Sequence, residues 1–187
     1  MKILLSSFVA CAAIAITIGA PRVMAASGTI IDNNAVPGRA VIKVAAYSVS
    51  PPGKWTVAVG KTGAIRYQSI DGAQQMQIGV IEMHPKAKET EDDVFRAFVD
   101  GRRQLEHENI ENKALKADAV SYADSTRGKL ASWTVIDPAG SSGHLTAILA
   151  SKRKLLIVSY DAGKVGETEF RASAEEVTSS MALGDGK

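Results

Sequence analysis

The chain has 187 residues, of which 22 are Lys or Arg and 20 are Asp or Glu, so its formal net charge is only +2. A balance this close to neutral excludes a general electrostatic attraction to nucleic acid or to anionic lipid. The single cysteine excludes an intramolecular disulfide.

The first 25 residues have the pattern of a secretory signal peptide. Lys2 supplies a positive charge, Ile3 to Gly19 form an apolar run, and Val23-Met24-Ala25 has the small residues that a signal-peptidase site requires. We therefore predict cleavage after Ala25 and a periplasmic or secreted mature protein. A retained membrane anchor is less favoured because the apolar run has only 17 residues. A lipoprotein is less favoured because the run continues past Cys11.

Cleavage at this position changes the composition of the mature chain. Lys2, Cys11 and Arg22 leave with the signal peptide, so the mature chain is formally neutral and has no cysteine. Thiol redox chemistry, thiolate metal sites and cysteine catalysis are then excluded. The fold must depend on burial alone, which a domain of roughly 160 residues can supply.

Turn residues divide the mature chain into a leader and a series of strands. Residues 26–38 are small and polar and contain Asn-Asn and Pro-Gly, which predicts a flexible N-terminal leader before a single domain over 39–187. Beyond the leader, β-branched and alternating apolar residues predict strands. The expected strands span 40–49, 55–59, 65–70, 76–83, 120–123, 130–136, 144–150 and 155–160.

Two segments have helical patterns. Thr90 has capping-box spacing to Asp93, so the first helix is expected to begin there and to fray near Glu108 or Asn109. The second helix is expected from Glu167 to Leu183. The predicted buried stripes are Val94, Phe95, Phe98, Val99 and Leu105 in the first helix and Phe170, Ala174, Val177 and Met181 in the second.

The grouping of strands and helices favours an α+β fold. The short loops between the strands over 130–160 predict antiparallel neighbours in a meander. Clustered strands with isolated helices do not suit a doubly wound parallel sheet. Because the strand over 76–83 is apolar on both faces, we expect an antiparallel sheet with helices packed on both faces, an α-β-α sandwich.

This order of elements resembles a known family. The segment Pro51-Pro52-Gly53-Lys54-Trp55-Thr56-Val57 leads into strands, an acid-capped helix follows, and the meander ends in Ser159-Tyr160 before the last helix. The pattern is similar to the PsbP-like family, which includes the photosystem extrinsic subunit and exported DcrB-type proteins. The resemblance spans roughly 41–183 and implies an α-β-α sandwich with a non-enzymatic role in assembly or partner binding. It supplies no catalytic residues.

Several short motifs resemble nucleotide-binding, hydrolase or metal-binding motifs, but their residue spacing does not match the spacing that those sites require. Gly60-Lys61-Thr62 ends like a phosphate-binding loop but lacks the first Gly, so no nucleotide site is predicted. In Gly140-Ser141-Ser142-Gly143-His144 the closing Gly comes one residue too early for a nucleophile elbow, which favours a hairpin loop without hydrolase chemistry. His84, His107 and His144 lack metal-ligand spacing. We predict no catalytic, cofactor-binding or metal-binding residue.

Two cationic features have both a structural and a functional interpretation. Arg102 falls within the apolar stripe of the first helix, either with its stem over apolar surface or as a paired cation at the mouth of a pocket. Lys152-Arg153-Lys154 forms either a solvated hairpin tip or a binding site for acidic partners or lipid headgroups. Trp55 and Trp133 lie among aliphatic residues and are expected in the core.

The sequence favours a non-catalytic exported domain that acts in protein interaction or envelope assembly and uses no cofactor. An envelope protein is the expected partner, nucleic acid and nucleotide are not expected, and contact with a membrane surface is not indicated. The alternative is a carrier of a small ligand or lipid with a pocket between sheet and helices. A cavity of roughly 300 Å³ or more would favour the carrier, and a filled core would favour interaction.

Overall fold

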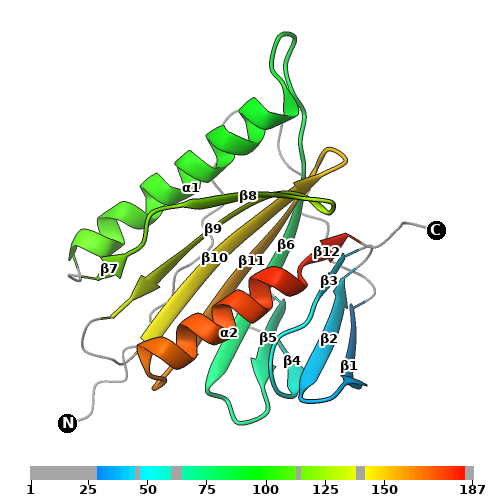
Figure 1. Cartoon of the computed structure of the whole chain (residues 1–187), viewed down its shortest axis with the longest axis vertical. Coiled ribbons are helices and arrows are strands. Elements are labelled where there is room, and N and C mark those ends of the chain that lie inside the picture. Colours follow the sequence, from blue (N-terminus) through cyan, green and yellow to red (C-terminus); the bar gives the residue numbers. More distant parts are fainter. Residues whose placement is uncertain (1–28, 45–46, 60–64, 113–114, 138–141, 184–187) are drawn as a thin grey trace.

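The structure is a computed structural model that describes residues 29–44, 47–59, 65–112, 115–137 and 142–183. It contains two helices, α1 and α2, and two antiparallel sheets (Figure 1). The predicted signal peptide and its cleavage site lie outside the described residues. The elements in chain order are β1 Thr29–Val36, β2 Arg39–Val44, β3 Tyr47–Val49, β4 Trp55–Val59, β5 Ile65–Ser69, β6 Gln74–Glu82, α1 Glu91–Asn112, β7 Lys116–Ala117, β8 Ser121–Ser125, β9 Gly128–Ile136, β10 Ser142–Ser151, β11 Lys154–Gly163, α2 Glu167–Ser180 and β12 Ala182–Leu183.

The large sheet has the strand order β4-β5-β6-β11-β10-β9-β7, and β8 also pairs with β9. The strands β9, β10 and β11 are consecutive in the chain and are antiparallel neighbours. The predicted meander is therefore confirmed. The longest pairing joins β10 and β11 from Ser142↔Gly163 to Ser151↔Lys154.

The small sheet corrects two of our expectations. Residues Thr29–Val36 form β1, which pairs with β2 through Thr29↔Val44 and Asp32↔Val41, so a loose leader is wrong for this segment. The single strand expected over 40–49 is two strands, β2 and β3, which pair with each other through Val44↔Tyr47. Asparagine and Pro-Gly signals mark turns, but they do not exclude pairing with a neighbouring strand that the sequence alone cannot identify.

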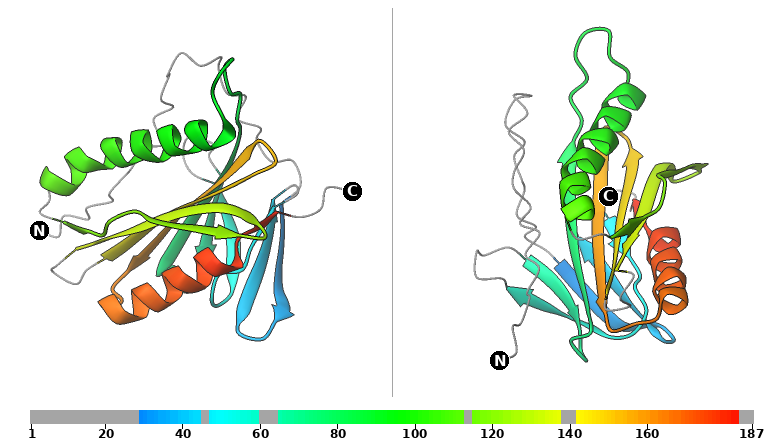
Figure 2. Two further views of the ribbon diagram at one scale, coloured as in Figure 1. Left: turned by 45° about the horizontal axis from the view of Figure 1, so that its top comes forward. Right: turned by 90° about the vertical axis from the view of Figure 1, so that its left-hand side faces the viewer.

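The buried side chains form two hydrophobic clusters. The first contains residues of the small sheet, of α2 and of the large sheet, among them Leu149 of β10. The second contains residues of α1 and of the large sheet, among them Ile148 of β10. Because successive side chains of a strand point to opposite faces, the two clusters lie on opposite faces of the large sheet. Figure 2 shows α1 and α2 beside the strands from two further directions.

The α2 helix packs through the predicted stripe. Phe170, Ala174 and Val177 of α2 and Met181 directly after it are all at most 3% exposed, and the helix ends at Ser180 rather than at the expected Leu183. The Phe170 ring stacks on Tyr160 of β11 with centroids 6.0 Å apart and an interplanar angle of 7°. Tyr160 in turn lies 6.3 Å from Trp55, so aromatic rings fill the space between α2, β11 and β4.

The start of α1 agrees with the predicted capping box. The Asp93 N–H donates to Thr90 Oγ1 at 3.1 Å, and the Thr90 N–H donates to Asp93 Oδ2 at 2.7 Å. These bonds satisfy donors that the first turn leaves without helical partners. The helix continues to Asn112, beyond the end that we expected near Glu108.

The buried face of α1 differs from the predicted stripe in its second half. Phe95 and Val99 are buried as expected, but Leu105 is 47% exposed. The residues that continue the buried face are Arg102 and Glu106, whose side chains are 16% and 12% exposed. The hydrophobic pattern predicted the wrong buried side for this half of the helix, because the apolar Leu105 is exposed and the neighbouring carboxylate of Glu106 is buried. Neither helix of the described residues is long and apolar enough to cross a membrane.

Candidate functional site

Three places in the described residues combine polar groups with burial or a recess. The first is a set of polar side chains between α1 and the large sheet, which we call the Glu106 network. The second is a small recess beside Arg127. The third is an open recess beside the β10–β11 turn, which we call the basic recess. The Glu106 network consists of Arg102 and Glu106 of α1, Trp133 of β9, His144 and Thr146 of β10 and Asp161 of β11.

The centre of the network is the Glu106 carboxylate. The indole Nε1–H of Trp133 donates to Glu106 Oε2 at 2.6 Å, and the Thr146 hydroxyl donates to Glu106 Oε1 at 3.0 Å. Arg102 Nε lies 3.4 Å from Glu106 Oε1, one helical turn earlier on α1. Both carboxylate oxygens therefore have donors, which a buried carboxylate needs to remain charged.

Arg102 agrees with only part of its second predicted role, because it is a paired and partly buried cation but does not line either of the two recesses described below. Its side chain is 16% exposed and is paired with Glu106. An arginine whose stem merely covers apolar surface would keep its charged head in water. In the described part of the chain this ion pair lies between α1 and the large sheet rather than at the mouth of an open pocket.

His144 connects the network to the edge of the helix–sheet interface. Its Nδ1 lies 2.7 Å from Asp161 Oδ1, and its Nε2 lies 3.0 Å from Thr146 Oγ1. The register His144↔Asp161 in the β10–β11 pair explains the first contact, and the two-residue spacing of His144 and Thr146 on one strand face explains the second.

A charged imidazole satisfies all of these bonds at once. With the Thr146 proton donated to Glu106, a protonated His144 Nε2 donates to the Thr146 oxygen. Asp161 is an acceptor when ionised, so Nδ1 carries a proton as well. Burial alone would lower the pKa of His144, but the carboxylates of Asp161 and Glu106 outweigh it and raise this pKa above its ordinary value of 6.5.

Asp161, His144 and Thr146 follow one another like the acid, base and nucleophile of a catalytic triad. Their geometry, however, is that of a structural hydrogen-bond network. Thr146 is 0% exposed, and its proton is directed to Glu106 rather than to His144. A nucleophile must be reachable by substrate and must give its proton to the base. These side chains therefore fasten α1 to β9, β10 and β11.

The sequence motif around His144 lies only partly within the described residues. Ser141 is outside them, whereas Ser142, Gly143 and His144 belong to β10 rather than to a hairpin loop. The sequence reasoning missed Glu106, Thr146 and Asp161 as partners of His144. The spacing of Phe95, Val99, Arg102 and Glu106 along one helix face was the available signal for Glu106.

The remaining sequence candidates have simpler surroundings. Gly60-Lys61-Thr62 lies outside the described residues. His84 has a side chain that is 69% exposed and lies 3.9 Å from Glu82, and His107 is also exposed. The described residues contain no group of three or more His, Cys, Asp or Glu side chains placed to hold a metal ion. Trp55 and Trp133 are 1% and 2% exposed, which confirms both as core residues.

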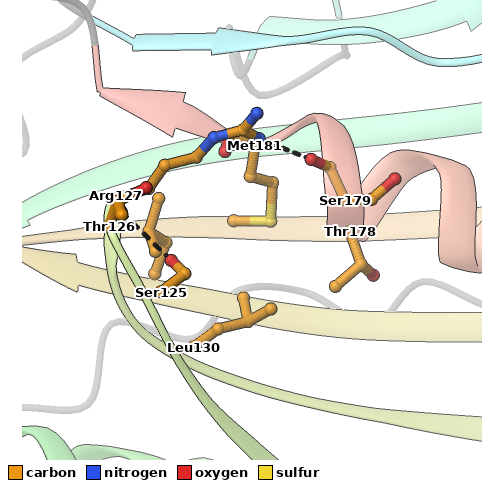
Figure 3. A pocket seen from close by; sticks show the side chains of 8 residues that line it. Ser125, Thr126, Arg127, Leu130, Thr178, Ser179 and Met181 are labelled. Carbon is orange, nitrogen blue, oxygen red and sulfur yellow. Dashed lines mark hydrogen bonds between the residues drawn. The ribbon is translucent and has the colours of Figure 1, made fainter.

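Figure 3 shows the recess beside Arg127, which lies between the β8–β9 turn and the end of α2. Arg127 Nη1 donates to the carbonyl oxygen of Ser179 at 2.5 Å and to that of Met181 at 3.3 Å. The guanidinium thereby satisfies carbonyl groups at the helix end. The recess has a volume of about 180 Å³, and the side chains of Leu130 and Met181 line its apolar part.

The basic recess is larger and more open. It has a volume of about 640 Å³ and is lined by residues 82–87 and Glu89, which follow β6, and by residues 152–154 of the β10–β11 turn. Lys152 and Arg153 adopt left-handed backbone conformations, with φ of 47° and 61°. The predicted hairpin tip at Lys152-Arg153-Lys154 is thus confirmed, and it forms one wall of the recess.

The comparisons with known proteins bear on the fold. No family model matches the chain, and no curated protein matches it. The structure is similar to the solution structure of cyanobacterial PsbP (CyanoP) from Synechocystis sp. PCC 6803. The TM-score is 0.54 and the sequence identity is 13%, and the match covers 74% of this chain and 86% of that chain. The described residues therefore form a sheet-rich α+β fold that is PsbP-like.

Proposed function

We propose that this protein is a non-catalytic exported domain that acts through protein interaction or assembly in the cell envelope, with the three α-β-α layers of a PsbP-like sandwich. The observation that carries the proposal is the filled interior between α2 and the two sheets. Trp55, Tyr160 and Phe170 are each at most 1% exposed there, and their rings contact one another. A domain with such a core offers its outer surface, rather than a cavity, to other molecules.

The volumes of the recesses favour interaction over the carrier function. The recess beside Arg127 holds about 180 Å³, which is less than the roughly 300 Å³ at the lower end of ligand pockets. The basic recess is large enough at about 640 Å³, but charged side chains line it. A lipid tail requires an apolar lining, which neither of these two places provides at the necessary size.

The Glu106 network supports a non-enzymatic function. Its one hydroxyl, that of Thr146, is buried and hydrogen-bonded to a carboxylate. An acyl-transfer site would need an accessible nucleophile and donors for an oxyanion beside it. The signal-peptide pattern at residues 1–25 supports export, and the DcrB-type resemblance belongs to the same proposal.

The interaction function is tested by capture of partners from envelope extract. The full chain is expressed with a C-terminal tag and cross-linked in living cells, and the material bound to it is identified by mass spectrometry. An unrelated exported domain with the same tag is the control. We expect one or a few envelope proteins that are enriched over the control, and an absence of enriched proteins would contradict the proposal.

Two further measurements separate the other function classes. Native mass spectrometry of the purified protein would reveal a lipid or small ligand that co-purifies with it, and such a ligand would favour the carrier. A fluorophosphonate probe labels activated serines, and labelling that depends on His144 would favour a hydrolase. N-terminal sequencing of the exported protein should begin at Ala26 if the predicted cleavage site is used.

A further inference from the structure

The walls of the basic recess come from two segments that are distant in the sequence. Residues 82–87 leave β6, and residues 152–154 turn from β10 into β11. The Met83 N–H donates to the carbonyl oxygen of Arg153 at 2.7 Å, which holds the two walls together. The lining contains four Lys or Arg residues and two Glu residues, so it carries a net positive charge, whereas the whole chain of 187 residues has a formal net charge of only +2.

Several Lys and Arg residues at this recess have a left-handed backbone conformation, which residues with a side chain rarely adopt. Among the described residues, the non-glycine residues with positive φ are Lys88, Lys152, Arg153 and Lys164. Lys152 and Arg153 line the recess, and Lys88 lies between the lining residues Ala87 and Glu89. A two-residue hairpin turn with both residues left-handed favours Asn-Gly, because a Cβ atom disfavours this conformation. The chain thus places positive charge where the backbone alone would favour Asn and Gly.

One cation of the recess, Arg153, pairs with a carboxylate that lies outside the lining and that a ligand could replace. Glu91 Oε1 lies 3.3 Å from Arg153 Nε, and these side chains are 48% and 75% exposed. An ion pair with this exposure contributes little to stability, so a carboxylate from another molecule can take the place of Glu91 at small cost. The internal pair therefore shows that the Arg153 guanidinium in this recess accepts a carboxylate as its partner.

The surroundings favour a protein segment over a membrane surface. The exposed large hydrophobic residues of the described chain are Ile30, Val36, Val57, Ile70, Leu105 and Tyr122, and none of them lies in 82–89 or 152–154. Stable attachment to a bilayer requires apolar insertion or a larger cationic cluster. In addition, Glu82 and Glu89 in the lining would repel a uniformly anionic surface, whereas a flexible segment can direct its carboxylates to the cations alone.

From these observations we propose that the basic recess binds a carboxylate-rich segment of a partner protein, with Lys152, Arg153 and Lys154 as the cations that contact its Asp or Glu side chains. The proposal rests on the proposed interaction function and names the surface and the chemistry of the partner. Binding of this kind is weakened by salt, because the charges involved are exposed.

The test uses a variant that removes charge without straining the fold. In the double variant Lys152→Asn, Arg153→Gly, both new residues suit the left-handed turn, so its unfolding midpoint in denaturant should equal or exceed that of the wild type. The matched control is Lys164→Gly, which also removes a cation from a left-handed position. Lys164 follows β11 at the end opposite Lys154, roughly 30 Å from the recess at the rise of a β-strand.

The probe is a fluorescein-labelled peptide of alternating Glu and Ser, and the same peptide with Gln in place of Glu is the neutral comparison. At low salt the wild type should bind the Glu peptide, and the double variant should bind it about tenfold more weakly. The control variant should differ from the wild type by less than about twofold, and raising NaCl to about 0.3 M should weaken binding by the wild type.

Other outcomes would overturn the proposal. Equal binding of the Glu peptide by the wild type and the double variant would show that the recess is not the site. If the wild type bound phosphatidylglycerol vesicles more tightly than it bound the Glu peptide, the recess would be a site for a membrane surface instead. If an envelope partner is captured equally by the wild type and the double variant, the recess is excluded while the interaction function remains. If no partner is captured, the interaction function fails, whatever the peptide does.

Discussion

The indole of Trp133 on β9 donates a hydrogen bond of 2.6 Å to Glu106 on α1, across the interface between the helix and the large sheet. The same carboxylate accepts a bond from Thr146 and pairs with Arg102. The second half of the buried face of α1 is thus held by charge and hydrogen bonds, whereas Phe95 and Val99 hold the first half by apolar contact. Removing Glu106 should therefore affect stability more than removing its exposed apolar neighbour Leu105.

Glu106→Ala should lower the free energy of unfolding by about 3 to 5 kcal/mol, because it leaves buried donors and the Arg102 charge without their acceptor. Leu105→Ala is the matched control on the same helical turn. Leu105 is 47% exposed, and its loss should cost less than about 1 kcal/mol. Denaturant unfolding of both variants provides the comparison. A larger cost for Leu105→Ala would mean that the helix has the opposite phase.

Stability should depend on the protonation of His144. Its pKa in the folded protein is raised above 6.5, so its favourable contribution is fully present below pH 6.5 and is lost as the pH rises through the folded value. The difference in unfolding free energy between the wild type and His144→Gln should therefore shrink as the pH rises above 6.5 and through the raised pKa of the folded protein. Denaturant unfolding across this range measures the difference.

Asp161→Asn gives the control for this pH dependence. Burial lowers the pKa of His144, and the hydrogen bond to Asp161 is the largest of the effects that raise it. Without that carboxylate the pKa of His144 should fall, and the pH dependence should move to lower pH. An NMR titration of the His144 ring in the two proteins reports this directly. An unchanged titration would show that Asp161 does not contact the ring.

The ion pair of Asp118 and Arg171 should stabilise the fold with a pH dependence opposite to that of His144. Arg171 Nη1 of α2 lies 2.5 Å from Asp118 Oδ2, which also accepts a bond from Thr134. The hydrogen bond from Arg171 lowers the pKa of Asp118 below 3.8, so this contribution is present above pH 3.8 and is lost as the pH falls through the folded value.

Asp118→Asn should cost about 1 kcal/mol near neutral pH, since both side chains are more than a third exposed and solvent weakens the pair. The difference from the wild type should decrease below pH 3.8. Glu167→Gln removes the other carboxylate that bonds to Arg171, at 2.9 Å on the same helix, and should cost about 0.5 kcal/mol or less. Equal losses in the two variants would contradict a particular role for Asp118.

The sequence predicts the elements that depend on nearby residues. The bonds between Thr90 and Asp93 are local, and so is the spacing of Phe170, Ala174, Val177 and Met181, and both predictions are confirmed. The meander follows from loop length, which is also local. The loose leader was a wrong prediction, because β1 is defined by its pairing with β2 rather than by its own composition.

The Glu106 network could not be predicted in the same way. His144 meets Asp161 only because the β10–β11 register places them opposite each other, and Glu106 reaches Thr146 only because α1 packs over β10. A shift of one residue in either pairing would direct these side chains to the other face of the sheet. The residues in these two contacts are therefore separated by 17 and 40 positions, and their contact is a consequence of the fold.

Gly143 on β10 lies against the ring of Phe170 on α2, and this contact gives the last prediction. A Cβ atom on Gly143 would come 2.5 Å from Phe170 Cγ, which is closer than real Cβ contacts. Because Phe170 is stacked on Tyr160, its ring cannot withdraw without loss of packing. Gly143→Ala should therefore destabilise the fold by about 1 to 3 kcal/mol. The control is Gly79→Ala in β6, where a Cβ atom would meet nothing within 4 Å, and where the change should be neutral or slightly stabilising. Thermal and denaturant unfolding of the two variants distinguish the cases. If Gly143→Ala were as stable as Gly79→Ala, α2 would have to sit farther from β10 than the structure places it.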